Sequence, residues 1–184
     1  MTNRLFISAE IPEEIKENII EIITEVCEIE NSSKWESKNK YHITLKFLGD
    51  VEEIDINSID FNLEKIITSF NRINCSFTKF GIFRKGNIPS VLWLGIKADS
   101  SLEKIAEKIN NDFVALGFKK DIRKFQPHLT IKRLKYNERI NEIDNLLNSK
   151  LPEINFTIEK ISLMKSELLK SGSVYTKLKV YELN

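Results

Sequence analysis

Hydrophobic positions along the chain follow two periods, and the changes between them divide it into alternating strands and helices. Stripes of isoleucine, leucine and phenylalanine three to four residues apart predict amphipathic helices. Ser100 with Glu103 three residues later is a capping-box pattern, and Gly117 is suited to end the helix that begins there. The four helices are expected over 11–26, 56–70, 100–116 and 137–149.

Short apolar or alternating runs between these stripes predict β-strands. The strands are expected over 4–10, 41–50, 73–83, 91–98 and 128–134, with a loop over 84–90 and a closing β-hairpin formed by 155–168 and 173–183. Strands and helices interleave along the whole chain, and neither a linker nor a low-complexity segment divides it. A chain of 184 residues fits one domain, or two small lobes that share a core.

The two histidines open the same five-residue pattern, which is His-aliphatic-Thr-aliphatic-Lys. Side chains two positions apart in a strand project from the same face. His42 and Thr44 therefore share one face, and His128 and Thr130 share another, with aliphatic residues packed behind them. Each strand is expected to present an imidazole beside a hydroxyl on a rigid element.

Ordinary hydrogen bonding in a half-buried sheet is the simplest interpretation of a lone histidine in a strand. Threonine occupies 8 of the 184 positions, so chance alone rarely places it two residues after both histidines. The matching aliphatic positions and lysines make coincidence less plausible still. The repeated pattern favours a shared chemical role.

Two imidazoles and two hydroxyls suit acid–base chemistry better than metal binding. Neither motif has a carboxylate or thiol at a matching position, so two histidines alone would leave a zinc ion short of ligands. One imidazole can accept a proton while the other donates one, as in-line displacement at phosphorus requires. The hydroxyls can bond the non-bridging oxygens of the phosphate. We expect neither a metal nor a cofactor.

The stretches HITLKFLGDV and FQPHLTIKRL resemble the paired HxTx motifs of the 2H phosphoesterase superfamily. More closely, the chain resembles the bacterial and archaeal RNA 2′,3′-cyclic phosphodiesterases, once called 2′-5′ RNA ligases, through RLFISAEIPEEIK, GIF…VLWLGI and LMKSELLKSGSVYTKL. The resemblance implies an α+β fold of two lobes, each an antiparallel sheet with helices on its outer face, with a central cleft between them. Residues 1–184 would form a single two-lobed domain with a pseudo-two-fold internal repeat.

The same resemblance implies an activity and roles for the motif residues. The expected reaction is hydrolysis of a terminal 2′,3′-cyclic phosphate in RNA to a 2′-phosphate without a metal ion. By resemblance His42 is the proton donor to the 3′ oxygen, His128 is the proton acceptor that activates water, and Thr44 and Thr130 are phosphate ligands. The residues alone do not assign which ring is the acid. Arg133 matches a basic residue often found past the second motif, but strand alternation points it away from the site.

Residues around the motifs are candidates for binding the substrate, which would be an RNA end or a nucleotide bearing the cyclic phosphate. By strand alternation the motif lysines share the faces of the histidines, the basic pair at 84–85 can touch phosphates or be solvated, and aromatic residues can stack a base. The candidates are Tyr41, Lys46, Arg84, Phe125 and Lys132. Phe47 lies opposite His42 by alternation and is expected in the core, as are Trp35 and Trp93. The RKGN stretch departs from the Pro- and Arg-rich version common in relatives.

Composition adds few constraints. With 41% hydrophobic and 30% charged residues the chain is typical of a soluble globular protein, and its net charge of +1 does not indicate binding to duplex nucleic acid. Cys27 and Cys75 are expected to be reduced, buried thiols. The N-terminus lacks the layout of a signal peptide and no apolar run approaches membrane-spanning length, so we expect a cytoplasmic protein. We also expect a monomer, because nothing in the sequence suggests a dimer interface.

Two alternatives stay open at this level. A module that captures RNA ends without converting them would use the same cleft, although such a module would not need two titratable rings. The reverse reaction, which joins ends through a 2′-5′ linkage, would use the same groups with a 5′-hydroxyl in place of water.

Overall fold

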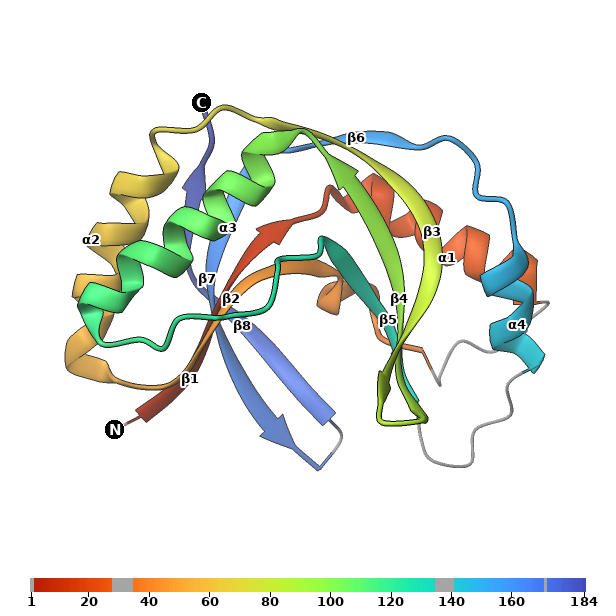
Figure 1. Ribbon diagram of the computed structural model, residues 1–184, viewed down its shortest axis with the longest axis horizontal. Helices are drawn as coiled ribbons and strands as arrows, with labels where there is room; N and C mark the ends of the chain where they lie inside the picture. The colour runs from red at the N-terminus through yellow and green to blue at the C-terminus, as the bar shows by residue number, and fades with distance from the viewer. Residues whose placement is uncertain (1, 28–34, 135–140, 171) are drawn as a thin grey trace.

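The computed structural model shows strands and helices in nearly the predicted order (Figure 1). It describes residues 2–27, 35–134, 141–170 and 172–184. The strands are β1 (Thr2–Glu10), β2 (His42–Glu52), β3 (Ile73–Lys85), β4 (Ile88–Ala98), β5 (His128–Arg133), β6 (Asn155–Ile158), β7 (Lys160–Leu169) and β8 (Gly172–Glu182). The helices are α1 (Glu13–Cys27), α2 (Ile56–Ile67), α3 (Ser100–Asp112) and α4 (Asn141–Asn148), with 3₁₀ turns at Lys38–Lys40, Glu53–Asp55 and Phe113–Leu116.

The strands of the described chain form one antiparallel sheet in the order β6-β3-β4-β5-β2-β1-β7-β8. Its two halves meet at the centre, where β2 pairs with β5 through Ile43 and Leu129. We call β1, β2, β7 and β8 the first lobe, and β3, β4, β5 and β6 the second lobe. The predicted two-lobed α+β fold is confirmed, and both motif strands lie at the junction of the lobes.

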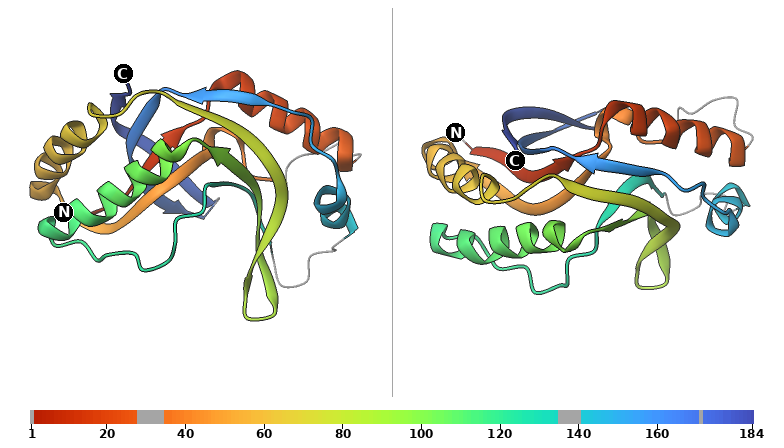
Figure 2. Two further views of the ribbon diagram at one scale, coloured as in Figure 1. Left: turned by 45° about the horizontal axis from the view of Figure 1, so that its top comes forward. Right: turned by 90° about the horizontal axis from the view of Figure 1, so that it is seen from above.

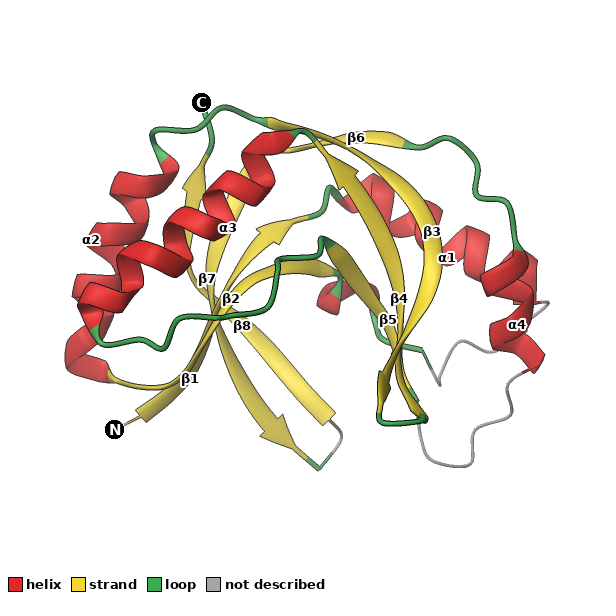
Figure 3. Ribbon diagram, viewed as in Figure 1, coloured by secondary structure: helices red, strands yellow, loops and turns green. Residues whose placement is uncertain are grey.

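Each lobe has its own pair of helices, and the pairs flank the curved sheet at opposite ends (Figures 2 and 3). In the first lobe α2 contacts β8 and α3 contacts β2, whereas in the second lobe α4 contacts β3 and α1 packs on α4. The apolar stripe predicted for the first helix is buried in α1 at Ile15 and Ile19. Burial of such a side chain contributes about 1.5–3 kcal/mol.

The chain crosses between lobes just before each motif strand. Helix α1 packs in the second lobe, yet residues 35–41 lead from that side into β2 of the first lobe. Helix α3 packs in the first lobe, and residues 117–127 lead from it into β5 of the second lobe. Both histidines therefore follow a segment that connects the two lobes.

The C-terminal segment differs from the predicted hairpin. Residues 155–168 form two strands instead of one, because β6 pairs with β3 in the second lobe while β7 pairs with β1 and β8 in the first. Glu159 stands between them, where the chain passes from one lobe to the other. Local alternation gives no sign of this change of partner.

Three smaller features refine the predicted boundaries. Most of the expected loop over 84–90 belongs to β3 and β4, which turn tightly at Gly86 with a φ of 61°. Helix α3 is capped by Asp99, whose carboxylate accepts from the Ser101 amide at 2.8 Å, instead of by Ser100. Gly117 ends the following 3₁₀ turn in the left-handed region, as predicted. The first part of the expected helix over 137–149 lies outside the described residues.

Both cysteines are buried, and they form no disulfide with each other, as predicted. No helix in the described part of the chain is long and apolar enough to cross a membrane.

Candidate active site

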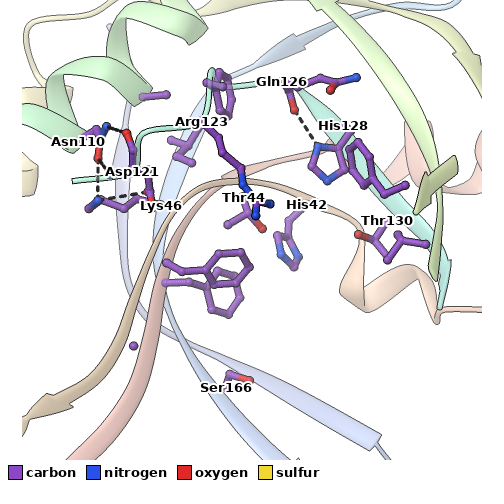
Figure 4. Close-up of a pocket in the computed structure, with 18 of the residues that line it drawn as sticks. His42, Thr44, Lys46, Asn110, Asp121, Arg123, Gln126, His128, Thr130 and Ser166 are labelled. Atoms are coloured by element: carbon purple, nitrogen blue, oxygen red, sulfur yellow. Dashed lines mark hydrogen bonds and ion pairs between the residues drawn. The ribbon is translucent and has the colours of Figure 1, made fainter. Parts of the chain in front are cut away.

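The central strand pair brings the two histidine motifs together (Figure 4). Because β2 and β5 are antiparallel and pair at Ile43 and Leu129, His42 lies toward Thr130 and Thr44 lies toward His128. All four of these side chains line one cleft. The alternation of the sequence is therefore correct for the first three residues of both motifs.

Backbone carbonyls and neighbouring aromatic rings orient the imidazoles. The Nδ1 atom of His128 lies 2.7 Å from the Gln126 carbonyl oxygen, which can only accept, so Nδ1 carries the proton and Nε2 of the neutral ring holds a free lone pair. The His128 ring also meets Phe83 edge-on, with 4.8 Å between centroids. The imidazole of His42 forms a hydrogen bond with the backbone of Lys40. Both rings are thus held by the residue two positions before them.

Aromatic residues of the first lobe surround His42. Its ring centroid lies 5.0 Å from that of Phe6 on β1 and 5.4 Å from that of Tyr175 on β8. These contacts desolvate the ring, and burial is the largest cause that lowers the pKa of His42 to about 4. The hydrogen bond to Lys40 opposes the shift, while the positive charges of Lys16 and Arg133 add to it.

Burial also lowers the pKa of His128, and its hydrogen bond to Gln126 acts in the opposite direction. Both imidazoles are therefore neutral near pH 7 when the cleft is empty. A negatively charged phosphate placed between them would favour the protonated form of either ring.

Both motif strands contain a bulge after the threonine. The register of β2 against β1 skips Leu45, and that of β5 against β4 skips Ile131. A bulge inverts the alternation of the residues that follow it. Lys46 and Lys132 are consequently buried, at 2% and 3% exposure, instead of lying on the histidine faces.

The same bulges turn Phe47 and Arg133 toward the cleft. Phe47 is 69% exposed and lines the cleft, so its predicted place in the core is wrong. Its ring centroid lies 6.0 Å from that of Phe6. Arg133 also lines the cleft, although simple alternation points it away, and its Nε lies 3.5 Å from a Glu36 carboxylate oxygen.

The cleft is large and positively charged. Its volume is about 1780 Å³, and among the described residues ten basic and four acidic side chains line it, while the whole chain carries a net charge of +1. Many of the basic residues come from the segment that enters β5: Lys119, Lys120, Arg123 and Lys124. Figure 4 shows Arg123 extending from this segment toward the strand of His42 and Thr44.

The sequence matches the model of the 2′-5′ RNA ligase superfamily over residues 11–168. The chain belongs to this superfamily. A curated RNA 2′,3′-cyclic phosphodiesterase of Methanocaldococcus jannaschii is 33% identical over 96% of this chain and 98% of its own. Another, of Thermotoga maritima, is 31% identical over 94% of this chain and 91% of its own. The resemblance noted in the sequence is thereby confirmed.

Solved structures agree on the fold of this superfamily member. E. coli LigT complexed with 3′-AMP superposes with a TM-score of 0.77 at 21% identity, covering 100% of this chain and 99% of that one. A Thermus thermophilus protein, TT0787, gives the same TM-score at 22% identity, covering 98% of this chain and 97% of its own.

The structure separates the remaining candidate residues into two groups. Arg84 and Phe125 line the cleft. Tyr41 does not line it, because its side chain is 3% exposed in the core, where burial raises the pKa of its hydroxyl to about 12. Lys46 borders the cleft, but its ammonium, like that of Lys132, is directed into the protein. The base-stacking role predicted for Tyr41 and the substrate-binding role predicted for both lysines are thus unsupported by their positions.

Sequence reasoning missed Arg123, Arg133 and Phe47 as cleft residues. The signal for Arg123 was present, because KKDIRK is a dense basic run just before the second motif. Arg133 and Phe47 were assigned to the wrong face because a bulge leaves no mark in an alternating pattern.

The described part of the chain offers no cluster of potential metal ligands. Among the residues that the structure describes, no group of three or more His, Cys, Asp or Glu side chains is arranged to hold a metal ion.

The lowered histidine pKa values predict an acidic optimum for kcat/KM. Acid–base catalysis by the two histidines, as expected from the sequence, would need one ring protonated and the other neutral. Both pKa values in the free protein lie below the ordinary 6.5, that of His42 at about 4. As pH falls from about 8, the protonated fraction rises, so kcat/KM should increase and reach its maximum between these two pKa values. The rate of hydrolysis of a nucleoside 2′,3′-cyclic phosphate, measured from about pH 4 to 9, tests this. A maximum above about pH 7 would contradict it.

Proposed function

We propose that this protein hydrolyses the 2′,3′-cyclic phosphate at the 3′ end of RNA to a 2′-phosphate by two-histidine acid–base catalysis without a metal ion. The observation that carries the proposal is the pair of imidazole–hydroxyl faces on adjacent strands at the base of a positively charged cleft. The names of the curated relatives, which are RNA 2′,3′-cyclic phosphodiesterases, support it.

His128 is suited to activate water. Its Nδ1 proton is directed to the Gln126 carbonyl, so Nε2 is the atom that accepts a proton. Water attacks phosphorus and transfers a proton to His128, while the bond from phosphorus to the 3′ oxygen breaks. That oxygen takes a proton from His42, which leaves a 3′-hydroxyl and a 2′-phosphate. Proton exchange with solvent then returns both rings to their starting states.

The substrate itself supplies the charge that His42 needs to act as the acid. In the empty cleft the positive charges of Lys16 and Arg133 help to lower the pKa of His42. A bound phosphodiester anion offsets these charges and favours the imidazolium. Protonation of His42 is thus linked to binding, and the protein should take up a proton when a phosphate ligand binds.

The threonines and the cationic residues complete the phosphate site. Thr44 and Thr130 approach it from the two lobes, and their hydroxyls can donate to the non-bridging oxygens. Arg123 and Arg133 add positive charge where the transition state gathers negative charge. Arg84 lies on β3 and also lines the cleft, so its proposed role is to contact the phosphate of a neighbouring nucleotide.

The dimensions and chemistry of the cleft favour an RNA chain over a lone nucleotide. Pockets for small ligands measure about 300–1,000 Å³, and this cleft exceeds that range at about 1780 Å³. Phe47 and Phe125 offer ring faces or edges to unstacked bases, the usual way in which single-stranded RNA is held.

Product identification tests the proposal. The protein is incubated in EDTA with each nucleoside 2′,3′-cyclic phosphate and with a short RNA ending in one, and the phosphate isomer is assigned by ³¹P NMR. Only the 2′-phosphate is expected, at the same rate with and without EDTA. The doubly substituted His42→Ala/His128→Ala protein, purified identically, controls for contaminating ribonucleases. A 3′-phosphate product, loss of activity in EDTA or bound but unchanged substrate would contradict the proposal.

A further inference from the structure

Both histidine motifs end in a lysine, and neither ammonium is directed at the reacting groups of the cleft. The Lys46 ammonium is buried and donates to the Asn110 side-chain oxygen at 2.8 Å, to the Lys119 carbonyl at 2.8 Å and to an Asp121 carboxylate oxygen at 3.2 Å. An ammonium is expensive to bury without partners. These three partners compensate the buried charge of Lys46 (Figure 4).

The partners of Lys46 belong to α3 and to the segment that enters β5. Asn110 reinforces the same segment, because its amide nitrogen donates to the Asp121 carbonyl at 2.9 Å and its oxygen accepts from the Asp121 amide at 2.8 Å. This segment continues to Arg123 in the cleft and to Gln126, whose carbonyl holds the ring of His128. A lysine on the strand of the first histidine thus fixes the approach to the second.

Lys132 has the equivalent relation to the segment that enters β2. Its ammonium lies 4.7 Å from the centre of the Trp35 ring, a cation–π contact. Its neighbours in β5 hold the same segment, because the Ile131 carbonyl accepts from the Glu36 amide at 3.0 Å and Arg133 pairs with the Glu36 carboxylate. The segment continues through Lys40, whose backbone holds the ring of His42.

We propose that Lys46 and Lys132 are reciprocal positioning residues, each fixing the segment that leads into the histidine of the opposite lobe. The bulges after Thr44 and Thr130 make this arrangement, because they turn both lysines away from the cleft and toward these segments. Both segments cross between the lobes, so the two attachments together set how the imidazoles face each other. The catalytic consequence rests on the proposed function, whereas the positioning itself does not.

The chain offers a direct measurement, since its two histidines give two imidazole signals in a ¹H–¹³C NMR spectrum. Lys46→Met should shift the signal and titration of His128 more than those of His42. Lys132→Met should do the opposite. Asn110→Leu breaks the Lys46 network without altering β2 and should reproduce the pattern of Lys46→Met, and it also serves if Lys46→Met does not fold. Lys65→Met, on the exposed face of α2, is the matched control and should move neither signal.

Activity supplies a second readout. A displacement of about 1 Å at reacting groups lowers rates by about 10²-fold, so kcat should fall by about 10- to 100-fold in either motif-lysine variant, with a smaller change in KM. If each substitution disturbs mainly the histidine of its own strand, or disturbs both equally, the proposal is overturned. If the wild-type protein does not hydrolyse cyclic phosphates but the reciprocal NMR pattern holds, the proposed function fails and the positioning stands.

Discussion

Replacing either His42 or His128 with alanine should lower kcat for cyclic phosphate hydrolysis by about 10²–10⁴-fold. Each ring is expected to carry one of the two protons that move during the displacement, and both rings line the cleft. The two residues act on the same displacement, so the double variant should be little worse than the poorer single variant. Steady-state rates for the three variants measure both effects.

Folding must be verified independently, because His42 packs against both Phe6 and Tyr175 and its removal leaves space beside these rings. Thermal unfolding followed by circular dichroism is the control, and His42→Asn is a second variant that retains a polar side chain. A folded single variant that retains about a tenth or more of wild-type activity would contradict the two-histidine mechanism, because loss of a general acid or base lowers the rate by more than about tenfold.

Removing one threonine hydroxyl should have the next largest effect. Under the proposed mechanism, Thr44→Val and Thr130→Val preserve shape but leave a non-bridging phosphate oxygen without its donor. Loss of one such donor typically lowers kcat by about 10²–10³-fold. The corresponding Thr→Ser variants keep the hydroxyl and should retain most activity.

Thr78 provides the matched control for these substitutions. It is an exposed strand threonine on β3 and does not line the cleft, so Thr78→Val should leave kcat and KM unchanged. If Thr44→Val and Thr130→Val behave like Thr78→Val, the hydroxyls do not contact the reacting phosphate.

The symmetric strand order around β2 and β5 is compatible with the expected pseudo-two-fold repeat, and the burial patterns of the two motif strands agree through their first six residues. The single domain with a pseudo-two-fold repeat stays a prediction, as does the expected monomer. This agreement explains a shared error: an equivalent bulge in each strand buries the lysine that simple alternation assigned to the face of the histidine.

Local signals were sufficient for most of the secondary structure. The stripe of α1, the end of the third helix at Gly117 and the outward pair His42 and Thr44 follow from periods of a few residues, which side-chain geometry imposes locally. The repeated motif also predicted the chemistry, because identical residue types at identical spacing require no knowledge of the fold.

The sequence by itself thus determined the strands, the helices and the imidazole–hydroxyl pairs. Only the tertiary structure decided that β2 and β5 meet, that Phe47 and Arg133 enter the cleft, and that the ammonium groups of Lys46 and Lys132 turn away from it. The reason is that strand pairing and bulges depend on partners distant in the chain. A single extra residue against a neighbouring strand reverses every later side chain, and nothing in the local pattern records it.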